Sequence, residues 1–311
     1  MRDVLVRLAA VVAFGAAAAF GAVAEETPPA DESEARIATT ITESDRMLAS
    51  VRIGESGPYP FIIDTAAERS VIAQQLAREL NLAPSGNGRL MSMTNTRAIS
   101  MVDAPAVSFG MGAPRDLRVF ALDGQHIGAA GVLGIDALRG QRVVLDFEAS
   151  EMRVGPAARA LPSTGPNDIV VRGRARYGQL VLIDSSAEGV EVDVIVDSGL
   201  QTSIGNEALR RLLVTRQNRF EALRFVSITG EAVIADYTLV DNLRIGGVAI
   251  RGLPVAFADT HFFRRMDMTR RPALLLGMDA LEMFRRVTVD FRNRRAHFLL
   301  PEDAPVVDET G

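Results

Sequence analysis

The sequence predicts an all-β protein, mainly strands with short helices, in which two lobes are related by a pseudo-twofold axis. Most of the chain consists of short apolar runs separated by Gly, Pro, Asp and Asn, which is typical of strands joined by turns. Residues 155–168 are rich in Pro, Gly and Ala and predict a linker. The segments on either side of this linker resemble each other, which indicates an internal duplication.

The start of the chain, residues 1–24, is typical of a signal peptide for export. Arg2 and Arg7 precede the apolar run LAAVVAFGAAAAFG, and AVA at 22–24 fits a cleavage site before Glu25. The run is shorter than the roughly 20 residues that a membrane-spanning helix needs. Because the chain has no Cys, and therefore no disulfide, we expect export to a bacterial periplasm. An uncleaved N-terminal membrane anchor is the alternative.

The remainder of the chain divides into segments by composition and by the internal repeat. Residues 25–36 are acidic and contain Pro, with little apolar surface to bury, so we expect a disordered lead-in, and the C-terminal end has a similar composition. The expected segments are a flexible N-terminal stretch (25–44), an N-terminal lobe (45–157), a linker (158–168), a C-terminal lobe (169–300) and a flexible acidic tail (301–311).

An apolar run ends in an aspartate at matching places in the two lobes. FIIDTAAERS places Asp64 after a predicted strand, and VIVDSGLQTS places Asp197 in the same way. Apolar periodicity after each copy predicts a helix, over 71–82 and over 206–213, the second with Asn206 as its N-cap. A single Asp at a strand end is common turn chemistry. Two matched copies are hard to obtain by chance, so the pair indicates a shared role.

A second pair of matched segments follows farther along each lobe. VLGIDAL (132–138) matches LLGMDAL (275–281), and a strand that ends in Asp-Phe comes after each. Because Asp136 and Asp279 precede Ala-Leu and a short helix-like stretch, N-capping or ion pairing is favoured over catalysis. Solvent-facing or turn positions are expected for the acids of the two Asp-Phe pairs, Asp146 and Asp290.

Two carboxyl groups that meet at a pseudo-twofold axis can act as one acid-base unit. At contact distance both cannot ionise together, so they share one proton and their apparent pKa values separate. The ionised member accepts a proton from water as the water attacks a carbonyl carbon, and the protonated member supports the developing oxyanion. Asp64 and Asp197 are therefore candidates for amide hydrolysis without a metal ion or a covalent intermediate.

The two Asp segments resemble the hydrophobic-Asp-[Thr/Ser]-[Gly/Ala] signature of aspartic proteases. VLGIDAL and LLGMDAL look like the apolar-apolar-Gly element of that family, in the Gly-x-Asp form that is similar to the retropepsin branch. Retropepsins normally carry one lobe per chain and dimerise, whereas this chain holds both lobes. The resemblance implies two acid-protease-like barrel lobes with a cleft between them, and an aspartic endopeptidase that binds a peptide or protein substrate in that cleft.

The resemblance also assigns roles to the matching positions. Asp64 and Asp197 would be the catalytic dyad. The hydroxyl groups of Thr65 and Ser198 would hydrogen-bond across the lobes and support the dyad. The small residues Ala66 and Gly199 would allow close approach of the backbone. The glycines Gly134 and Gly277 would lie under the catalytic loops. Residues 88–100 and 225–237 would be the substrate-covering flap and its counterpart.

Composition argues against several other classes of function. The chain has no Lys and no Cys, so Schiff-base and thiol chemistry are excluded, and it has no basic stretch for nucleic acid. His126, His261 and His297 are scattered without a metal-binding spacing, so we expect neither a metal nor a cofactor. No G-x-S-x-G segment supports a serine hydrolase.

Two other functions stay open at the level of sequence. The first is a catalytically inactive peptide-binding protein that retains the aspartic protease fold, although both aspartates and both hydroxyl residues are intact. The second is a glycosidase, which also uses paired carboxylates, but its residues need not be symmetry-equivalent. After signal cleavage we expect no membrane contact. A monomer is expected, with further dimerisation left open.

Overall fold

The computed structural model describes residues 35–37, 48–91, 96–110, 112–157, 159–165, 167–214, 220–226 and 232–302. Strands predominate and the helices are short, which confirms the expected all-β class. The predicted signal peptide (1–24) and most of the two predicted flexible ends lie outside the described residues. Within the described part of the chain, no helix has both the length and the apolar character needed to cross a membrane.

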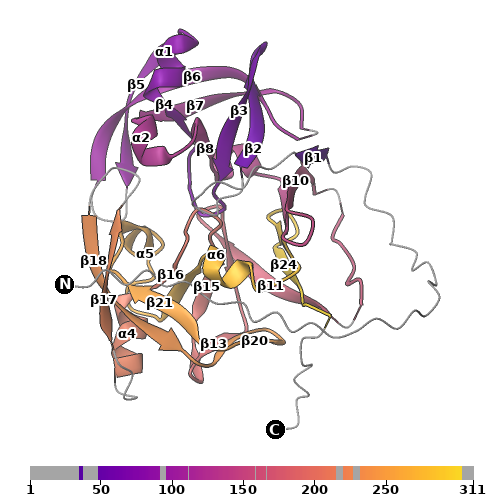
Figure 1. Cartoon of the computed structure of the whole chain (residues 1–311), viewed down its shortest axis with the longest axis vertical. Coiled ribbons are helices and arrows are strands. Elements are labelled where there is room, and N and C mark those ends of the chain that lie inside the picture. The colour runs from indigo at the N-terminus through magenta and orange to yellow at the C-terminus, as the bar shows by residue number, and fades with distance from the viewer. Residues whose placement is uncertain are drawn as a thin grey trace, which may run out of the picture. The chain divides into compact units, whose positions relative to one another are not determined.

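The first half of the protein is organised around a seven-stranded sheet (Figure 1). Its strands lie in the order β2-β3-β8-β4-β7-β6-β5, and β2 also pairs with β6. The elements are β2 (Leu48–Ile53), β3 (Ser56–Ile63), β4 (Val71–Ala73), α1 (Gln74–Glu79), β5 (Ala83–Met91), β6 (Thr96–Ser108), β7 (Arg115–Leu122), α2 (Gly124–Ile127), β8 (Gly131–Leu133) and α3 (Ile135–Leu138).

The second half repeats the same pairing pattern. In the first half β3 lies parallel to β8, and β4 lies antiparallel to β8 and parallel to β7. In the second half β15 lies parallel to β22, and β16 lies antiparallel to β22 and parallel to β21. The duplication predicted from the sequence is therefore also a duplication of sheet topology. Whether each lobe closes into a barrel stays a prediction.

The elements of the second half are mostly short strands. They are β11 (Asp168–Arg176), β12 (Gln179–Leu182), β13 (Ser185–Ala187), β14 (Val190–Glu191), β15 (Asp193–Val196), β16 (Ser203–Gly205), α4 (Glu207–Val214), β17 (Glu221–Val226), β18 (Ala232–Val240), β19 (Leu243–Ile245), β20 (Val248–Ile250), β21 (Leu253–Phe257), α5 (His261–Arg265), β22 (Ala273–Leu276), α6 (Met278–Leu281), β23 (Arg286–Asp290) and β24 (Arg295–Leu299).

A shared sheet joins the two halves. β9 (Gln141–Asp146) and β10 (Glu151–Pro156) come from the first half, and β9 pairs antiparallel with β23 of the second. β1 (Ala35–Ile37) pairs with β10, so the expectation of a flexible stretch over 25–44 is wrong for these three residues. The edge of β10 presents main-chain N–H and C=O groups, and pairing with β1 satisfies them.

A buried ion pair links the two central strands of this shared sheet. The guanidinium of Arg142 on β9 donates from Nη2 to Asp290 Oδ2 on β23 at 3.2 Å, and both side chains are almost fully buried. Asp290 was expected at a solvent-facing or turn position. The turn role is correct, because Asp290 Oδ1 accepts from Asn293 N at 2.8 Å, but the solvent-facing role is wrong. β23 pairs with strands on both sides, and the buried carboxylate at its end is paired with a cation.

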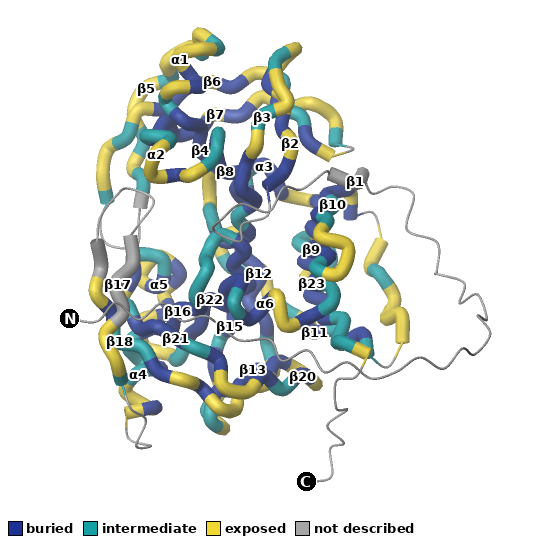
Figure 2. Tube along the Cα trace, in the orientation of Figure 1, coloured by how far each residue is buried: buried dark blue, intermediate teal, exposed yellow. Residues whose placement is uncertain are grey.

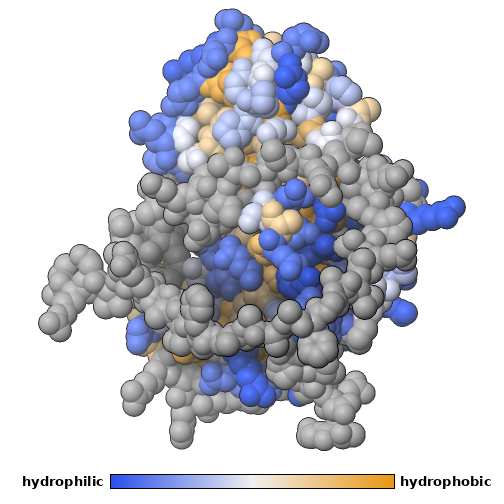
Figure 3. Space-filling view, turned by 45° about the vertical axis from the view of Figure 1, so that its right-hand side comes forward, coloured by the Kyte–Doolittle hydropathy of each residue, from blue (hydrophilic) through white to orange (hydrophobic). Residues whose placement is uncertain are grey.

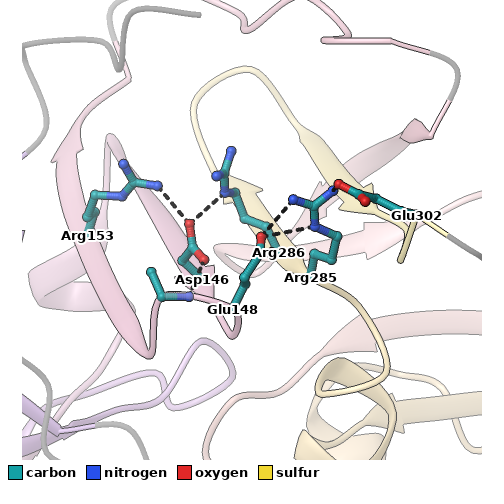
Figure 4. A network of polar contacts seen from close by, with 7 residues as sticks. Asp146, Glu148, Arg153, Arg285, Arg286 and Glu302 are labelled. Atoms are coloured by element: carbon teal, nitrogen blue, oxygen red, sulfur yellow. Dashed lines mark hydrogen bonds and ion pairs between the residues drawn. The ribbon is translucent and has the colours of Figure 1, made fainter. Parts of the chain in front are cut away.

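Asp146, at the other end of the β9–β23 pairing, shows the same combination (Figure 4). Its Oδ1 accepts from Ala149 N at 3.0 Å within the β9–β10 turn. Its Oδ2 accepts from Arg153 at 3.1 Å and from Arg286 at 2.9 Å, and the side chain is buried. The solvent-facing alternative is wrong here too. Each Asp-Phe pair therefore closes a turn while contributing a charge contact to the shared sheet.

Buried positions follow the strands of both halves, including β9, β15, β22 and β23 (Figure 2). Most of the buried apolar side chains form one continuous hydrophobic core. The described surface in the face drawn in Figure 3 carries many hydrophilic side chains with hydrophobic ones between them. The core thus holds the shared sheet and both lobes, and it provides a rigid base for the loops that follow β3 and β15.

Of the two predicted helices, only the second begins where it was expected. The segment 71–82 begins as strand β4 and becomes helix α1 only at Gln74. Its first residues, Val71 and Ile72, are β-branched and pair with β7 and β8, where they are buried. Helix α4 follows Asn206 as expected, and Asn206 Oδ1 accepts from Leu209 N at 2.9 Å, which confirms the predicted N-cap.

Candidate functional site

Each candidate aspartate follows the last residue of a strand that pairs with a parallel neighbouring strand. Asp64 follows β3, and its main-chain N–H donates to Leu133 O of β8 at 3.0 Å. Asp197 follows β15, and its N–H donates to Leu276 O of β22 at 2.9 Å. Because β3, β8, β15 and β22 end in buried apolar residues, both carboxyl groups enter their loops from a rigid base.

The structure brings the two carboxyl groups together. The side chains of Asp64 and Asp197 lie within hydrogen-bonding reach of each other. A Cβ atom on Gly199, in the loop after Asp197, would overlap the carboxyl group of Asp64. Both aspartates also line one cavity of about 1000 Å³. Two carboxyl groups from different halves of the chain therefore lie together at the wall of one cavity.

The hydroxyl residues next to the aspartates bind each other across the halves. Thr65 Oγ1 donates to Val196 O at 2.8 Å, and Ser198 Oγ donates to Ile63 O at 2.8 Å. The main-chain N–H of Thr65 donates to Ser198 Oγ at 3.2 Å, and that of Ser198 donates to Thr65 Oγ1 at 3.1 Å. Both side chains are buried. This two-way set of bonds joins the strand ends that carry the aspartates.

Main-chain N–H groups donate to both carboxyl groups. Asp64 Oδ1 accepts from Ala66 N at 2.9 Å and from Ala67 N at 2.7 Å. Asp197 Oδ1 accepts from Gly199 N at 3.0 Å. N–H donors favour the ionised form of a carboxyl group. The loop after Asp64 therefore offers two N–H donors that favour a negative charge on this carboxyl group.

Burial raises the pKa of Asp197 well above its ordinary value, and the negative charge of Asp64 raises this pKa further. N–H groups of Gly199 and Leu200 oppose the shift but do not reverse it. Asp197 is buried, whereas Asp64 is only half-buried. When the pair carries a single proton, this shift favours the proton on Asp197.

The small residues near the pair are packed closely. As noted, a side chain at Gly199 would overlap Asp64, whereas the matching position of the first lobe carries a methyl group on Ala66. A Cβ on Gly134 would lie 2.8 Å from Ala67 O, and one on Gly277 would lie 3.0 Å from Ser203 N. Gly134 and Gly277 thus lie directly against the loops that carry the aspartates, and a larger residue would push those loops away.

A serine-aspartate contact supports the first loop, and its role was not predicted from the sequence. Ser70 Oγ donates to Asp136 Oδ1 at 2.7 Å, and Ser70 N donates to the same oxygen at 2.9 Å. In turn, Ser70 Oγ accepts from Gly134 N at 3.0 Å. Asp136 was expected to cap a helix or to form an ion pair, but the N-cap residue of α3 is Gly134. Burial raises the pKa of Asp136.

The second lobe has the same contact. Ser203 Oγ donates to Asp279 Oδ1 at 2.7 Å and accepts from Gly277 N at 3.0 Å. Burial raises the pKa of Asp279 as well. Expectations of helix capping or ion pairing are therefore corrected for both aspartates, which hold the loops through serine. The equal spacing from each candidate catalytic aspartate to its serine was the signal in the sequence, but it does not reveal the partner.

Both halves contribute to the wall of the cavity. Apolar lining residues include Leu90, Phe120 and Leu117 from the first half and Ile204, Phe262 and Leu275 from the second. The expected flap, residues 88–100, falls on β5 and β6, and Gly88 and Arg89 line the cavity, while 92–95 lie outside the described residues. Its counterpart, 225–237, falls on β17 and β18, with 227–231 outside them and no cavity-lining residue among those described.

Charged side chains occur at the cavity wall beside the apolar ones. Arg265 of helix α5 donates to Glu68 Oε1, in the loop after Asp64, at 2.6 Å. This exposed ion pair connects the two halves beside the aspartates. Across the described residues, no group of three or more acidic or His side chains is placed to hold a metal ion.

Comparison with known proteins gives one finding. The family model described as aspartyl protease matches the chain twice, over residues 49–137 and over residues 183–280. Each match contains one of the two paired aspartates together with the Gly-x-Asp segment that supports its loop. No curated protein matches the chain.

Proposed function

The chain belongs to the aspartyl protease family, and on this premise we propose that it is an aspartic endopeptidase, which hydrolyses peptide bonds with a water activated by Asp64 and Asp197. The observation that carries the proposal is the contact between two carboxyl groups, one from each family segment, at the wall of a shared cavity. Membership of the family supports, in general terms, an enzyme that hydrolyses peptide bonds. The dyad and its activity are the proposal.

The two aspartates would take different roles in the reaction. The pKa of Asp197, raised by burial, favours the proton on Asp197 and the charge on Asp64. A water between the carboxyl groups gives its proton to Asp64 as its oxygen attacks the carbonyl carbon, and Asp197 donates its proton to the carbonyl oxygen. When the tetrahedral intermediate collapses, the carbon–nitrogen bond breaks and the nitrogen takes a proton from Asp64, while Asp197 regains its own.

Positioning would come from the surrounding hydrogen bonds. The Thr65 and Ser198 contacts hold the ends of β3 and β15 together, so the distance between the carboxyl groups is set before a substrate arrives. Ala66 N and Ala67 N orient the Asp64 carboxylate. Prearranged donors do not need to reorganise during the reaction, and this lowers the barrier.

The substrate would be a peptide segment lying in the cavity between the halves. A cavity of about 1000 Å³ with apolar walls is large enough for several side chains around the cleaved bond. Residues 88–90 line this cavity and would cover the substrate as part of a flap, which excludes water from the carboxyl pair. We expect no nucleic acid and no cofactor to take part.

The cellular setting is a further part of the proposal. The export pattern of residues 1–24 supports a periplasmic protein that begins at Glu25 after cleavage and acts as a monomer carrying both lobes. N-terminal sequencing of the protein from a periplasmic fraction tests this. A start at Glu25 is expected, whereas an intact N-terminus in the membrane fraction would favour the anchored alternative.

The deciding experiment compares the mature chain with its Asp64→Asn and Asp197→Asn variants. Each is incubated with a peptide library from digested casein between about pH 3 and pH 8, where carboxyl groups titrate in proteins, and cleavage is read by mass spectrometry. Loss of cleavage in both variants, with circular dichroism unchanged, is expected. Peptide binding without cleavage by the wild type would favour the inactive peptide-binding protein, and cleavage that survives in both variants would exclude the dyad.

A further inference from the structure

A tight hairpin of the second half reaches the active-site loop of the first. β11 and β12 pair with Arg176 opposite Gln179, which leaves Tyr177 and Gly178 as a two-residue turn. Both turn residues have positive φ, 49° and 88°, as such turns require. Tyr177 is 62% exposed and lines the cavity that contains the aspartates. The turn therefore places Tyr177 at the wall of the cavity that contains the carboxyl pair.

Several contacts hold this hairpin in place. Arg176 Nη2 donates to Asp267 Oδ2 at 3.0 Å. A Cβ on Gly178 would lie 3.5 Å from Ile135 of the first half, so the turn packs against that half. Gln179 Nε2 donates to Ala66 O at 2.6 Å, and the Gln179 side chain is buried. The hairpin is thus anchored both within its own lobe and across to the loop after Asp64.

The other end of the Gln179 side chain has no partner. Gln179 Oε1 is buried without a hydrogen bond, although the residue lines the same cavity as Asp64 and Asp197. The bond from Nε2 to Ala66 O determines which end of the amide is the oxygen. A buried carbonyl oxygen without a hydrogen-bond donor lowers the stability of the folded protein. Because this oxygen belongs to a residue that lines a cavity, a bound ligand can supply the missing donor.

We infer that Gln179 is a substrate-positioning residue, whose Oε1 accepts a main-chain N–H of the bound peptide next to the cleaved bond. The inference rests on the proposed peptidase function. An amide oxygen can only accept, and an extended peptide offers one N–H donor per residue. The terminal torsion of glutamine is soft, so Oε1 reaches an incoming N–H by a small rotation.

The same side chain also connects the peptide to the dyad. Gln179 binds Ala66 O, and Ala66 N donates to Asp64 Oδ1 at 2.9 Å. One amide therefore contacts the loop that orients the catalytic carboxylate and, in the complex, the main chain of the substrate. Because the contact is made to the main chain of the peptide, it helps to fix the position of the peptide along the cleft whatever side chains the peptide carries.

The test removes single N–H groups from a substrate. The casein-derived peptide that the wild type cleaves fastest is synthesised as a series in which one amide N–H at a time, other than at the cleaved bond, is replaced by an ester oxygen. kcat/KM is measured for the wild type, for Gln179→Met, which keeps the length of the side chain, and for Gln201→Met. Gln201 is a half-buried glutamine of the loop after Asp197 that does not line the cavity.

At one position of the series, the ester is expected to lower kcat/KM of the wild type and of Gln201→Met by about tenfold, which is the order of one hydrogen bond. The same ester should leave kcat/KM of Gln179→Met nearly unchanged, because this variant has already lost the acceptor. If every ester affects the wild type and Gln179→Met equally, the side chain only holds Ala66, and the inference is overturned. A wild type that cleaves no library peptide would instead overturn the proposed function itself, and with it the premise of the inference.

Discussion

Thr65 and Ser198 bind each other in both directions, because the main-chain N–H of each donates to the hydroxyl oxygen of the other, at 3.2 and 3.1 Å. Each hydroxyl group also donates to a strand of the opposite half. The two residues follow Asp64 and Asp197 directly and are buried. This contact between the halves therefore also sets the spacing of the carboxyl pair.

Replacing Thr65 by Val tests this contact. The variant removes the donor to Val196 O and the acceptor for Ser198 N, and leaves two buried main-chain groups without partners. The free energy of unfolding should fall by about 1–3 kcal/mol, read from urea unfolding. Thr65→Ser retains the hydroxyl and should lose less than Thr65→Val. Equal losses in the two variants would mean that the hydroxyl does not stabilise the junction.

Replacing Gly199 by Ala tests the close approach of the two loops. The added methyl group overlaps the Asp64 carboxyl group, so the loops must separate and the pair must shift. kcat should fall by about 100-fold, the usual effect of a displacement on the order of 1 Å at reacting groups. Gly247→Ala is the control, because its Cβ would meet Ile169 at 3.6 Å, an ordinary contact. A Gly199→Ala enzyme as active as this control would contradict the packing argument.

The raised pKa of Asp197 predicts how stability depends on pH. The unfolded chain releases this proton at about pH 4, whereas the folded chain retains it to higher pH, so the folded state binds more protons in between. The contribution of Asp197 to stability is complete below about pH 4 and is lost as pH rises through the folded pKa. Asp197→Asn removes this loss, so its unfolding free energy should increase relative to the wild type as pH rises.

Urea unfolding of the wild type and of Asp197→Asn at successive pH values measures this difference, which can grow by at most about 1.4 kcal/mol per pH unit for one proton. Glu55→Gln, at an exposed turn between β2 and β3, serves as the control and should show no such trend. A constant difference between the wild type and Asp197→Asn from pH 4 upward would exclude a retained proton on Asp197.

Breaking the ion pair between Arg142 and Asp290 should strongly destabilise the junction of the halves, because both side chains are almost fully buried. Arg142→Met leaves the Asp290 carboxylate buried without its cation and should lower the free energy of unfolding by about 3–5 kcal/mol. Arg118→Met, which breaks an exposed pair with Asp103, should cost less than about 1 kcal/mol. Similar losses in both variants, measured by urea unfolding, would contradict this ranking.

Several features of the fold and site could be predicted because they depend on local pattern. The strand ahead of Asp64 and the N-cap at Asn206 follow from short-range spacing, and the duplication follows from a repeated local motif. The helix expected from Val71 was wrong at its start, because pairing with β7 and β8 outweighs helical periodicity in β-branched residues. Asp146 and Asp290 were expected at the surface, because a single sequence does not reveal that β9 and β23 pair with each other.

By itself the sequence determined the strand-rich class, the two-fold repeat, the family and the identity of the two aspartates as a matched pair, since all of these follow from residues close together in the chain or from a repeated motif. Only the tertiary structure decided what those residues contact: the bonds between Thr65 and Ser198, the serine partners of Asp136 and Asp279, and the approach of Gln179 to Ala66. These contacts join segments far apart in the chain. Their partners are set by strand pairing and packing across the whole core, which local spacing does not encode.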